Sequence, residues 1–325
     1  MRIVICAPGL GPCGGARVII EIASRLQHRG HAVAITGPGI QPGWIDHDFP
    51  VVPLRTLVEP KTPYDVVVAT GYQTVVPAMA LPAKRKFYYV QMQEHLFYNE
   101  GSPGWREARA TYPAAQKADF NFITIATWQQ EVMKETWGIE SEMISVAVNR
   151  DHFYPDGPKQ DYILIEGDDR NPAKDVEGLA WHVGEVLRRD YGISLYGYAA
   201  YQHSHAHIFD RFVIRPSERR MRRLYSGALF LLKASKYEGR AGAVSEAMVC
   251  GTTCARAIIE GDEDVMDGYT GLRVAYQYTP LLDAARLLAE DTRLRRQLER
   301  NCLKHTRTHL RWQPVVDQLE AAFQG

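Results

Sequence analysis

The sequence predicts an α/β protein built from two doubly wound parallel sheets. Short, near-continuous apolar segments alternate with longer segments of helical periodicity, and this alternation runs through the chain twice. A strand without polar alternation is buried on both faces, as in a parallel sheet covered by helices. The 325 residues also exceed a typical domain about twofold, which favours two domains.

The first half begins with a strand at residues 3–7, a Gly/Pro-rich loop at residues 8–15 and a helix at residues 16–29. Further strands are predicted at residues 31–36, 64–69, 86–91 and 121–126. Ligands of such sheets bind beyond the carboxyl ends of the strands, so the loops that follow strands are the candidate sites.

A second round follows the polar, Pro-containing segment at residues 149–159. Strands are predicted at residues 162–166, 193–196, 211–214, 229–234 and 253–257, helices at residues 176–189, 218–226 and 244–250, and a polar helical tail from residue 280. We therefore expect one domain at residues 1–153, a second at residues 154–308 and a C-terminal helix at residues 309–325.

The composition excludes several classes of protein. The 38 Lys and Arg balance the 38 Asp and Glu, so no global field attracts nucleic acid or an anionic membrane. The five cysteines form no paired framework, which indicates free thiols in a reducing compartment. The N-terminus enters a strand directly, and no apolar run reaches the length of a membrane span. We expect a cytoplasmic protein.

The loop at residues 8–15 matches the dinucleotide fingerprint G-x-G-x-x-G from Gly9 to Gly14. That fingerprint also requires an acidic residue at the end of the second strand, and this strand ends at Thr36 without one. We therefore reject a dinucleotide site. Gly14 and Gly15 instead let the backbone approach a phosphate or a substrate at a helix N-terminus.

The second half contains two carboxylates, Glu238 and Glu246, on either side of a loop with Gly239 and Gly242. This segment follows an apolar strand and opens a helix. Flexible residues let backbone N–H groups point into a cleft, and the helix N-terminus adds a positive end. The segment can therefore hold a diphosphate and sugar hydroxyls. On chemistry alone, a glycine-rich turn with two solvated glutamates explains it equally well.

Residues 238–251, E-G-R-A-G-A-V-S-E-A-M-V-C-G, resemble the Glu-x7-Glu motif of family 4 retaining glycosyltransferases, which have the GT-B fold. Residues 260–274 resemble the family segment that ends D-G-x-T-G-L-L-V. Similar likenesses lie at Gly14 to Val18, at Arg29 to Val33, at Leu224 to Ala228 and in the tail helix. The resemblance thus spans nearly the whole chain.

The resemblance implies two Rossmann-like domains that face a central cleft, with the last helix crossing back to the first domain. It places a nucleoside-diphosphate sugar in the second domain, with Glu238 near the reacting sugar and Glu246 on the ribose. The remaining donor-binding residues would be Arg170, Lys174, Gly239, Arg240, Ala241, Gly242, Ala243 and Val244. Arg170 and Lys174 would neutralise the leaving diphosphate, where negative charge builds up.

Residues 88–102 resemble a narrower group, the rhamnan and other surface-polysaccharide transferases with the pattern Y-F-V-Q-D-x-E-P-x-F-Y. The Asp of that pattern is Met92 here. Glu94 matches the pattern, and His95 stands where it has Pro. We expect Glu94 and His95 to touch acceptor or sugar hydroxyls, with the acceptor bound between Gly14 and the loop at residues 91–104. Rim residues whose hydrogen bonds are satisfied within the protein are the alternative.

The expected function is thus retaining, metal-independent sugar transfer to a saccharide, lipid-linked or other hydroxyl acceptor, without a cofactor. The alternatives are a catalytically degenerate GT-B protein that only binds a sugar nucleotide or a partner, and another nucleotide-sugar enzyme such as an epimerase. The sequence does not name the sugar, the base, the acceptor or the oligomeric state.

Two conspicuous clusters receive simpler interpretations. His203, His205 and His207 alternate as metal ligands can, but no carboxylate or Cys accompanies them, so we expect a surface loop. The arginines between Arg215 and Arg223 are expected to form the solvated face of a helix. Contact of this face with anionic lipid or a lipid-diphosphate acceptor is the alternative.

Overall fold

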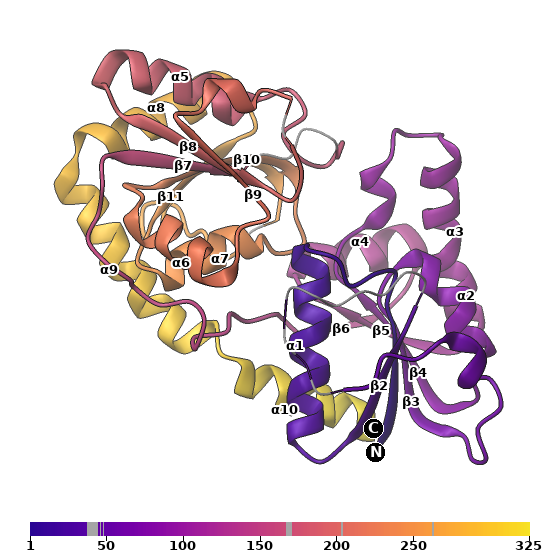
Figure 1. The fold of residues 1–325 in the computed structure, drawn as a ribbon. Coiled ribbons are helices and arrows are strands. Elements are labelled where there is room, and N and C mark those ends of the chain that lie inside the picture. Colours follow the sequence, from indigo (N-terminus) through magenta and orange to yellow (C-terminus); the bar gives the residue numbers. More distant parts are fainter. Residues whose placement is uncertain (38–44, 46, 48, 167–170, 203, 262) are drawn as a thin grey trace. The chain divides into compact units, whose positions relative to one another are not determined.

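The chain folds into two compact units in a computed structural model (Figure 1) that describes residues 1–325 except 38–44, 46, 48, 167–170, 203 and 262. Unit 1 comprises residues 1–146 and 313–325, and unit 2 comprises residues 147–312. Each unit contains a parallel sheet of six strands, so the predicted α/β class is correct. The two units are described separately.

The sheet of unit 1 has the order β2-β1-β3-β4-β5-β6. Its strands are β1 (Arg2–Cys6), β2 (Ala32–Thr36), β3 (Tyr64–Ala69), β4 (Ala83–Val90), β5 (Phe120–Thr124) and β6 (Ser141–Met143). Its helices are α1 (Gly14–His28), α2 (Tyr72–Ala80), α3 (Pro103–Lys117), α4 (Thr127–Trp137) and α10 (Trp312–Gln324). The order reverses between β1 and β3, so the loops after these strands flank the topological switch point.

Helices cover both faces of this sheet (Figure 1). Val75 of α2, Tyr112 of α3 and Met133 of α4 belong to the core on one face. On the other face, side chains of α1 and α10 meet those of β1, β3, β4 and β5. Residues far apart in the sequence therefore complete one core.

Helix α10 is fastened to unit 1 by charges as well as by apolar packing. Arg29 donates to Asp317 and to Glu320, both at 2.6 Å. The Nε2 atom of His31 lies 2.7 Å from Glu320. The rings of Phe87 and Phe323 lie 4.9 Å apart.

The sheet of unit 2 has the order β12-β11-β10-β7-β8-β9. Its strands are β7 (Tyr162–Glu166), β8 (Ser194–Ala199), β9 (Arg211–Ile214), β10 (Leu231–Tyr237), β11 (Cys254–Glu260) and β12 (Leu272–Ala275). Its helices are α5 (Leu179–Tyr191), α6 (Glu218–Gly227), α7 (Gly242–Val249), α8 (Tyr278–Glu290) and α9 (Thr292–His309). The order reverses between β7 and β10, which places the switch point between the loops after these strands.

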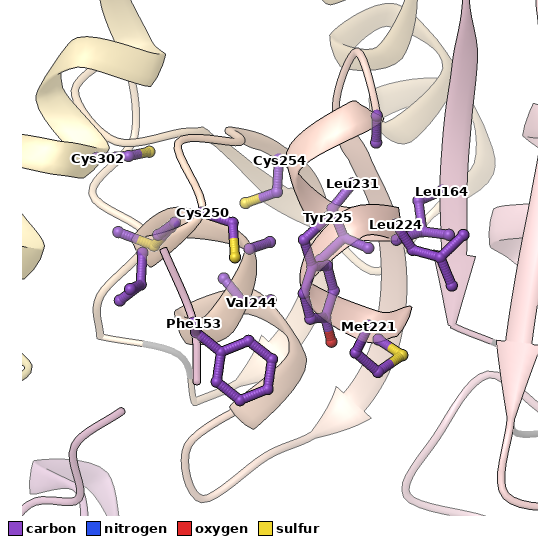
Figure 2. Close-up of a cluster of buried hydrophobic side chains, with 14 of the residues drawn as sticks. Phe153, Leu164, Met221, Leu224, Tyr225, Leu231, Val244, Cys250, Cys254 and Cys302 are labelled. Atoms are coloured by element: carbon purple, nitrogen blue, oxygen red, sulfur yellow. The ribbon is translucent and has the colours of Figure 1, made fainter. Parts of the chain in front are cut away.

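Helices α5 and α8 lie on one face of this sheet, and α6 and α7 lie on the other (Figure 1). Figure 2 shows the core on the α6 and α7 face, in which Phe153, Tyr225 and Val244 are buried together. The rings of Phe153 and Tyr225 lie 6.2 Å apart. This core fixes α7, and with it the turn that contains Glu238.

The boundary between the units differs from the expected one at residues 153 and 154. Val148 and Phe153 belong to the core of unit 2, so the chain enters that unit at residue 147. At the other end, Leu310 is still part of the unit 2 core, and the return to unit 1 begins at residue 313.

Several elements also differ from the prediction. Strand β10 runs over Leu231–Tyr237 and β11 over Cys254–Glu260, so both extend three residues beyond the predicted ends at residues 234 and 257. Helices α2, α3 and α4 and the short strands β6 and β12 were not predicted. Among the described helices, none combines the length and the apolar character that crossing a membrane requires.

Candidate donor site and acceptor loop

Glu238 lies directly after β10, at the switch point of unit 2. Its side chain is buried, with 6% of the residue exposed. The backbone N–H of Glu238 donates to the carbonyl of Glu260 at 3.1 Å. Gly261, at φ +117°, packs so closely on the Glu238 carbonyl that an added Cβ would lie 2.1 Å from the oxygen. The motif turn is therefore fixed to the end of β11.

Lys174 reaches Glu238 from the loop after β7. Its Nζ atom donates to Oε2 of Glu238 at 2.6 Å. The loop is held in place because the carbonyl of Ala173 accepts from the N–H groups of Lys236 and Tyr237 at 2.9 and 3.0 Å. The loops on the two sides of the switch point are thus tied together. Arg170, the predicted partner of Lys174, lies outside the described residues.

Three residues that the sequence did not single out complete this network. Lys233 of β10 pairs with Glu166 and lies 3.2 Å from Oε1 of Glu238. Arg256 of β11 lies 4.0 Å from the same oxygen. A charged residue between two buried apolar neighbours was the available signal, and it occurs in both strands.

The network holds Glu238 as an anion. Burial alone raises the pKa of a carboxyl group, but Lys174, Lys233 and Arg256 outweigh burial and hold the pKa of Glu238 well below its usual range. Within the described part of the network, these three cations face two carboxylates, those of Glu166 and Glu238. Lys174, the most exposed of these cations, can also attract an anionic ligand.

Arg240, which stands in the middle of the motif, is held by a buried carboxylate. Its Nε donates to Asp264 at 2.7 Å, and a second guanidinium nitrogen pairs with the other Asp264 oxygen. Ser245 donates to Asp264 at 3.2 Å, and His305 of α9 lies at the same distance. Burial raises the pKa of Asp264, but Arg240 and His305 outweigh it and bring the value to about 2. Arg240 thus anchors the turn to α9.

The rest of the predicted donor turn surrounds the start of α7. Gly239, Ala241 and Val244 are buried, Ala243 is half-buried and Gly242 is exposed. Gly242 is the first residue of α7 and has no atom within 4 Å of the position of an added Cβ. Open space therefore lies in front of a helix N-terminus, where an anionic group is favoured.

Glu246, the second motif carboxylate, lies beside a buried phenol. The pKa of Tyr225 is raised well above its usual value by burial, by Tyr198 and by the adjacent charge of Glu246. The hydroxyls of Tyr198 and Tyr225 lie 2.9 Å apart. The half-buried Glu246 is thus positioned by a phenol pair from β8 and α6.

In unit 1, Gly14 and Gly15 begin α1, and Cys13 caps this helix by accepting from the N–H of Ala16 at 3.4 Å. An added Cβ at Gly14 would have no neighbour within 4 Å. At Gly15 it would lie 3.4 Å from the amide of Gln91. The predicted loop thus adjoins the segment after β4, and both lie at the carboxyl edge of the sheet.

The side chain of Glu94 lies at the N-terminus of α2. Its carboxylate accepts from the N–H of Tyr72 at 2.6 Å and from the hydroxyl of Tyr88 at 2.8 Å. An N-terminal N–H of α2 has no hydrogen-bond acceptor within its own helix. Glu94, in the segment after β4, supplies that acceptor. Burial raises the pKa of Glu94 to about 7, although the bonds from Tyr88 and Tyr72 lower it.

His95 lies in an aromatic cage, with 6% of the residue exposed. Trp105, Tyr112 and Trp137 present or receive ring edges at centroid distances of 6.3, 6.3 and 5.7 Å. Burial, followed by the charge of Arg109, lowers the pKa of His95 to about 4. The imidazole is therefore neutral at neutral pH. Contact of Glu94 and His95 with an acceptor stays a prediction.

The two conspicuous clusters of the sequence have simple surroundings. His205 stacks on Trp181 at 4.6 Å, while His203 lies outside the described residues. No group of three or more metal-binding side chains occurs among the residues that the structure describes. In the arginine cluster, Arg222 pairs with Asp156 at 2.9 Å, and Arg219, Arg220 and Arg223 are exposed.

No protein-family model and no curated protein matches the sequence, but solved structures match the fold along its full length. Sucrose-phosphate synthase from Thermosynechococcus elongatus has a TM-score of 0.79 at 16% identity, with 100% of this chain and 98% of that chain covered. HepE from Anabaena, in complex with UDP and glucose, has a TM-score of 0.78 at 12% identity, with 100% of each chain covered.

A third similar structure is WaaG, a glycosyltransferase involved in lipopolysaccharide biosynthesis. Its TM-score is 0.75 at 16% identity, with 99% of this chain and 100% of that chain covered. At such identities a structural likeness shows the fold. The predicted GT-B fold, with two Rossmann-like units, is confirmed.

Proposed function

We propose that the chain is a glycosyltransferase that uses a nucleoside-diphosphate sugar as donor and a hydroxyl group of a saccharide or lipid-linked molecule as acceptor. The observation that carries the proposal is the Lys174–Glu238 pair at the switch point of unit 2. At this pair the described cations lie at the carboxyl edge of the sheet, where α7 also begins at the exposed Gly242 with open space around it. Cations offset the charge of a diphosphate, and a helix N-terminus favours an anionic group.

The similar structures support this choice of ligand. HepE structures are complexes with UDP, with UDP and glucose or with UDP-glucose, and a TarM structure is a complex with UDP, α-GlcNAc-glycerol and fondaparinux. We propose a comparable donor in unit 2, held by Lys174, Glu246 and the backbone of residues 239–244. Arg170 is proposed as a second diphosphate ligand.

The proposed reaction retains the anomeric configuration. The acceptor oxygen bonds to the anomeric carbon on the face from which the diphosphate departs, and the sugar–phosphate bond breaks. The acceptor proton passes to an oxygen of the leaving diphosphate. Lys174 offsets the charge that develops there, in the role that a metal ion would otherwise fill.

Glu238 contributes as an anion. Because its pKa is held well below the usual range, it does not donate a proton at neutral pH and accepts hydrogen bonds only. We propose that it orients the donor sugar through the sugar hydroxyls. The acceptor is proposed to bind in unit 1, near Gly14, Gly15, Glu94 and His95.

The test is incubation with UDP-, GDP- and dTDP-sugars, with and without acceptor extracts, while nucleoside diphosphate release is followed. We expect release with one base, and Glu238→Gln should reduce turnover far more than it weakens nucleotide binding. Glu177→Gln is the matched control, because Glu177 pairs with Lys236 at the surface of the same unit.

The absence of both release and thermal shift with every nucleotide would refute the proposal. Nucleotide binding without turnover under any acceptor condition would favour a degenerate binding protein. Equal losses of turnover and binding in Glu238→Gln would show that this residue is mainly structural.

A further inference from the structure

A row of charged side chains crosses the buried centre of the unit 2 sheet. Lys233 of β10 is in register with Arg256 of β11. Leu232 of β10 is in register with Ile165 of β7, so the next position brings Lys233 beside Glu166, and these two side chains pair. Residues in register point to the same face of a sheet. The row of Glu166, Lys233 and Arg256 therefore lies on one face, beneath Glu238.

The two oxygens of Glu238 have different partners. Oε1 accepts from Ser235 at 3.0 Å and lies 3.2 Å from Lys233 and 4.0 Å from Arg256. Oε2 pairs with Lys174 at 2.6 Å. One oxygen thus faces the strands and the other faces a loop.

These cations also differ in their exposure to solvent. The side chain of Lys233 is 3% exposed and that of Arg256 is 0% exposed, whereas that of Lys174 is 21% exposed. A buried cation cannot exchange its carboxylate for water without a large loss of free energy. An exposed lysine has a flexible stem and three rotatable donors, and can exchange one anion for another.

We propose that Lys233 and Arg256 are permanent counterions that position Glu238, and that Lys174 is an exchangeable cation. Lys174 moves from Oε2 of Glu238 to the incoming diphosphate, while Glu238 stays anchored through Oε1. The identity of the diphosphate rests on the proposed function, whereas the anchoring of Glu238 does not. Lys233 and Arg256 thus keep Glu238 ionised after Lys174 has moved to the diphosphate.

The charged groups that face Glu238 come from each element packed against it. Among the described residues they are Glu166 of β7, Lys233 of β10, Arg256 of β11 and Lys174 of the loop. After Lys174 has moved, Lys233 at 3.2 Å is nearer to Glu238 than Arg256 at 4.0 Å. Removal of Lys233 should therefore make diphosphate binding dependent on protonation of Glu238.

The first test is calorimetric titration with UDP at pH 6 in buffers of different ionisation enthalpy, which measures proton uptake. Lys236→Met is the control, because Lys236 lies on the same strand and pairs with Glu177 at the surface. The wild type and Lys236→Met should take up equal numbers of protons. Lys233→Met should take up additional protons, because loss of one nearby opposite charge raises a carboxyl pKa by about 1–3 units. Lys233→Arg should behave as the wild type does.

Equal proton uptake by Lys233→Met and Lys236→Met would overturn the exchange of Lys174. If Lys233→Met does not fold, Lys233→Met/Glu166→Gln removes both charges of one pair, and the same two outcomes apply to it. GDP or dTDP replaces UDP if only one of them binds.

The second test needs no ligand and remains decisive if no nucleotide binds. Ionised Glu238 stabilises unit 2 above its unfolded pKa, and this contribution is lost as the pH falls through the depressed folded pKa. Lys233→Met raises the folded pKa, so acid unfolding of unit 2 should move to higher pH by about 1 unit. Identical acid unfolding of Lys233→Met and Lys236→Met would overturn the anchoring of Glu238.

Discussion

Glu94 of unit 1 and Glu238 of unit 2 both follow the carboxyl ends of sheet strands, and these two glutamates have opposite surroundings. Glu94 of unit 1 is bonded by a backbone N–H and a phenol, whereas Glu238 of unit 2 faces three cations. Burial raises the pKa of both. With no cation among the causes of its shift, the pKa of Glu94 reaches about 7, whereas that of Glu238 falls well below its usual range.

The sheet topology therefore determines where a carboxylate lies, whereas the neighbouring charged groups determine whether it is ionised. At neutral pH Glu238 is an anion, while Glu94 exchanges a proton readily. Unit 2 is therefore suited to hold a ligand of fixed charge. The protonation of Glu94 can respond to whatever binds beside it in unit 1.

The largest expected effect concerns the glycines that pack against these two glutamates. Gly261→Ala should destabilise unit 2 by about 4 kcal/mol or more, because a Cβ would meet the Glu238 carbonyl at 2.1 Å and the residue has φ +117°. Gly71→Ala should cost unit 1 only about 1–2 kcal/mol. There the Cβ would lie 3.1 Å from Oε1 of Glu94 at an ordinary extended φ.

Urea unfolding combined with peptide-resolved hydrogen exchange would assign each loss to its unit. A Gly261→Ala variant as stable as Gly71→Ala would show that the end of β11 does not fix the Glu238 turn.

Arg240→Phe should have the next largest effect. Among the described residues, the change leaves buried Asp264 with Ser245 and His305 as its side-chain partners. Loss of one member of a buried pair should cost about 3 kcal/mol, measured by urea unfolding of unit 2. Arg222→Phe is a control, because Arg222 pairs with Asp156 in the same unit, where Asp156 is more exposed. Equal losses in both variants would argue against an anchoring role for Arg240.

Glu94→Gln should have a smaller effect that depends on pH. The folded pKa of about 7 lies above the ordinary value of 4.5, so folded unit 1 binds more protons than the unfolded chain between these values. Stability from this group is therefore complete below about pH 4.5 and is lost as the pH rises to about 7. In Glu94→Gln the free energy of unfolding should no longer fall with pH in this way, and urea unfolding between pH 4 and pH 8 would measure it. An unchanged slope would contradict the raised pKa.

The smallest expected effects come from two matched glycines, Gly14 and Gly242, each the first residue of a helix with open space around it. Alanine at either position should change stability by no more than about 1 kcal/mol. Gly242→Ala should weaken nucleotide binding about tenfold, or about 1.4 kcal/mol, because its Cβ enters the proposed donor space. Gly14→Ala should leave nucleotide affinity unchanged. Calorimetry would measure both, and the reverse pattern would place the nucleotide in unit 1.

The buried strands could be predicted from the sequence because parallel strands are apolar on both faces. Helices α2 and α3 could not, since each contains an internal proline, Pro77 and Pro113, which usually ends a helix. The edge strands β6 and β12 are too short to show a pattern. Strand β10 was predicted to end before Ser235 because its charged and polar residues resemble a loop.

The candidate site was predictable only in part for the same physical reason. Glu238 and Lys174 belong to loops whose composition indicates ligand binding. Lys233 and Arg256 lie inside strands, and their role depends on strand register, which a single sequence does not specify. Asp264 likewise becomes a partner of Arg240 only when the chain has folded.

The return of α10 to unit 1 has a consequence for synthesis on the ribosome. Leu319 and Phe323 complete an apolar surface that includes Ile5 and Ile19, yet they are translated after all of unit 2. At about 5–20 residues per second, unit 1 waits on the order of ten seconds or more for its last helix. During that interval its sheet has one face incompletely covered, a state that chaperones commonly protect. The order of translation therefore lets unit 2 finish folding before unit 1.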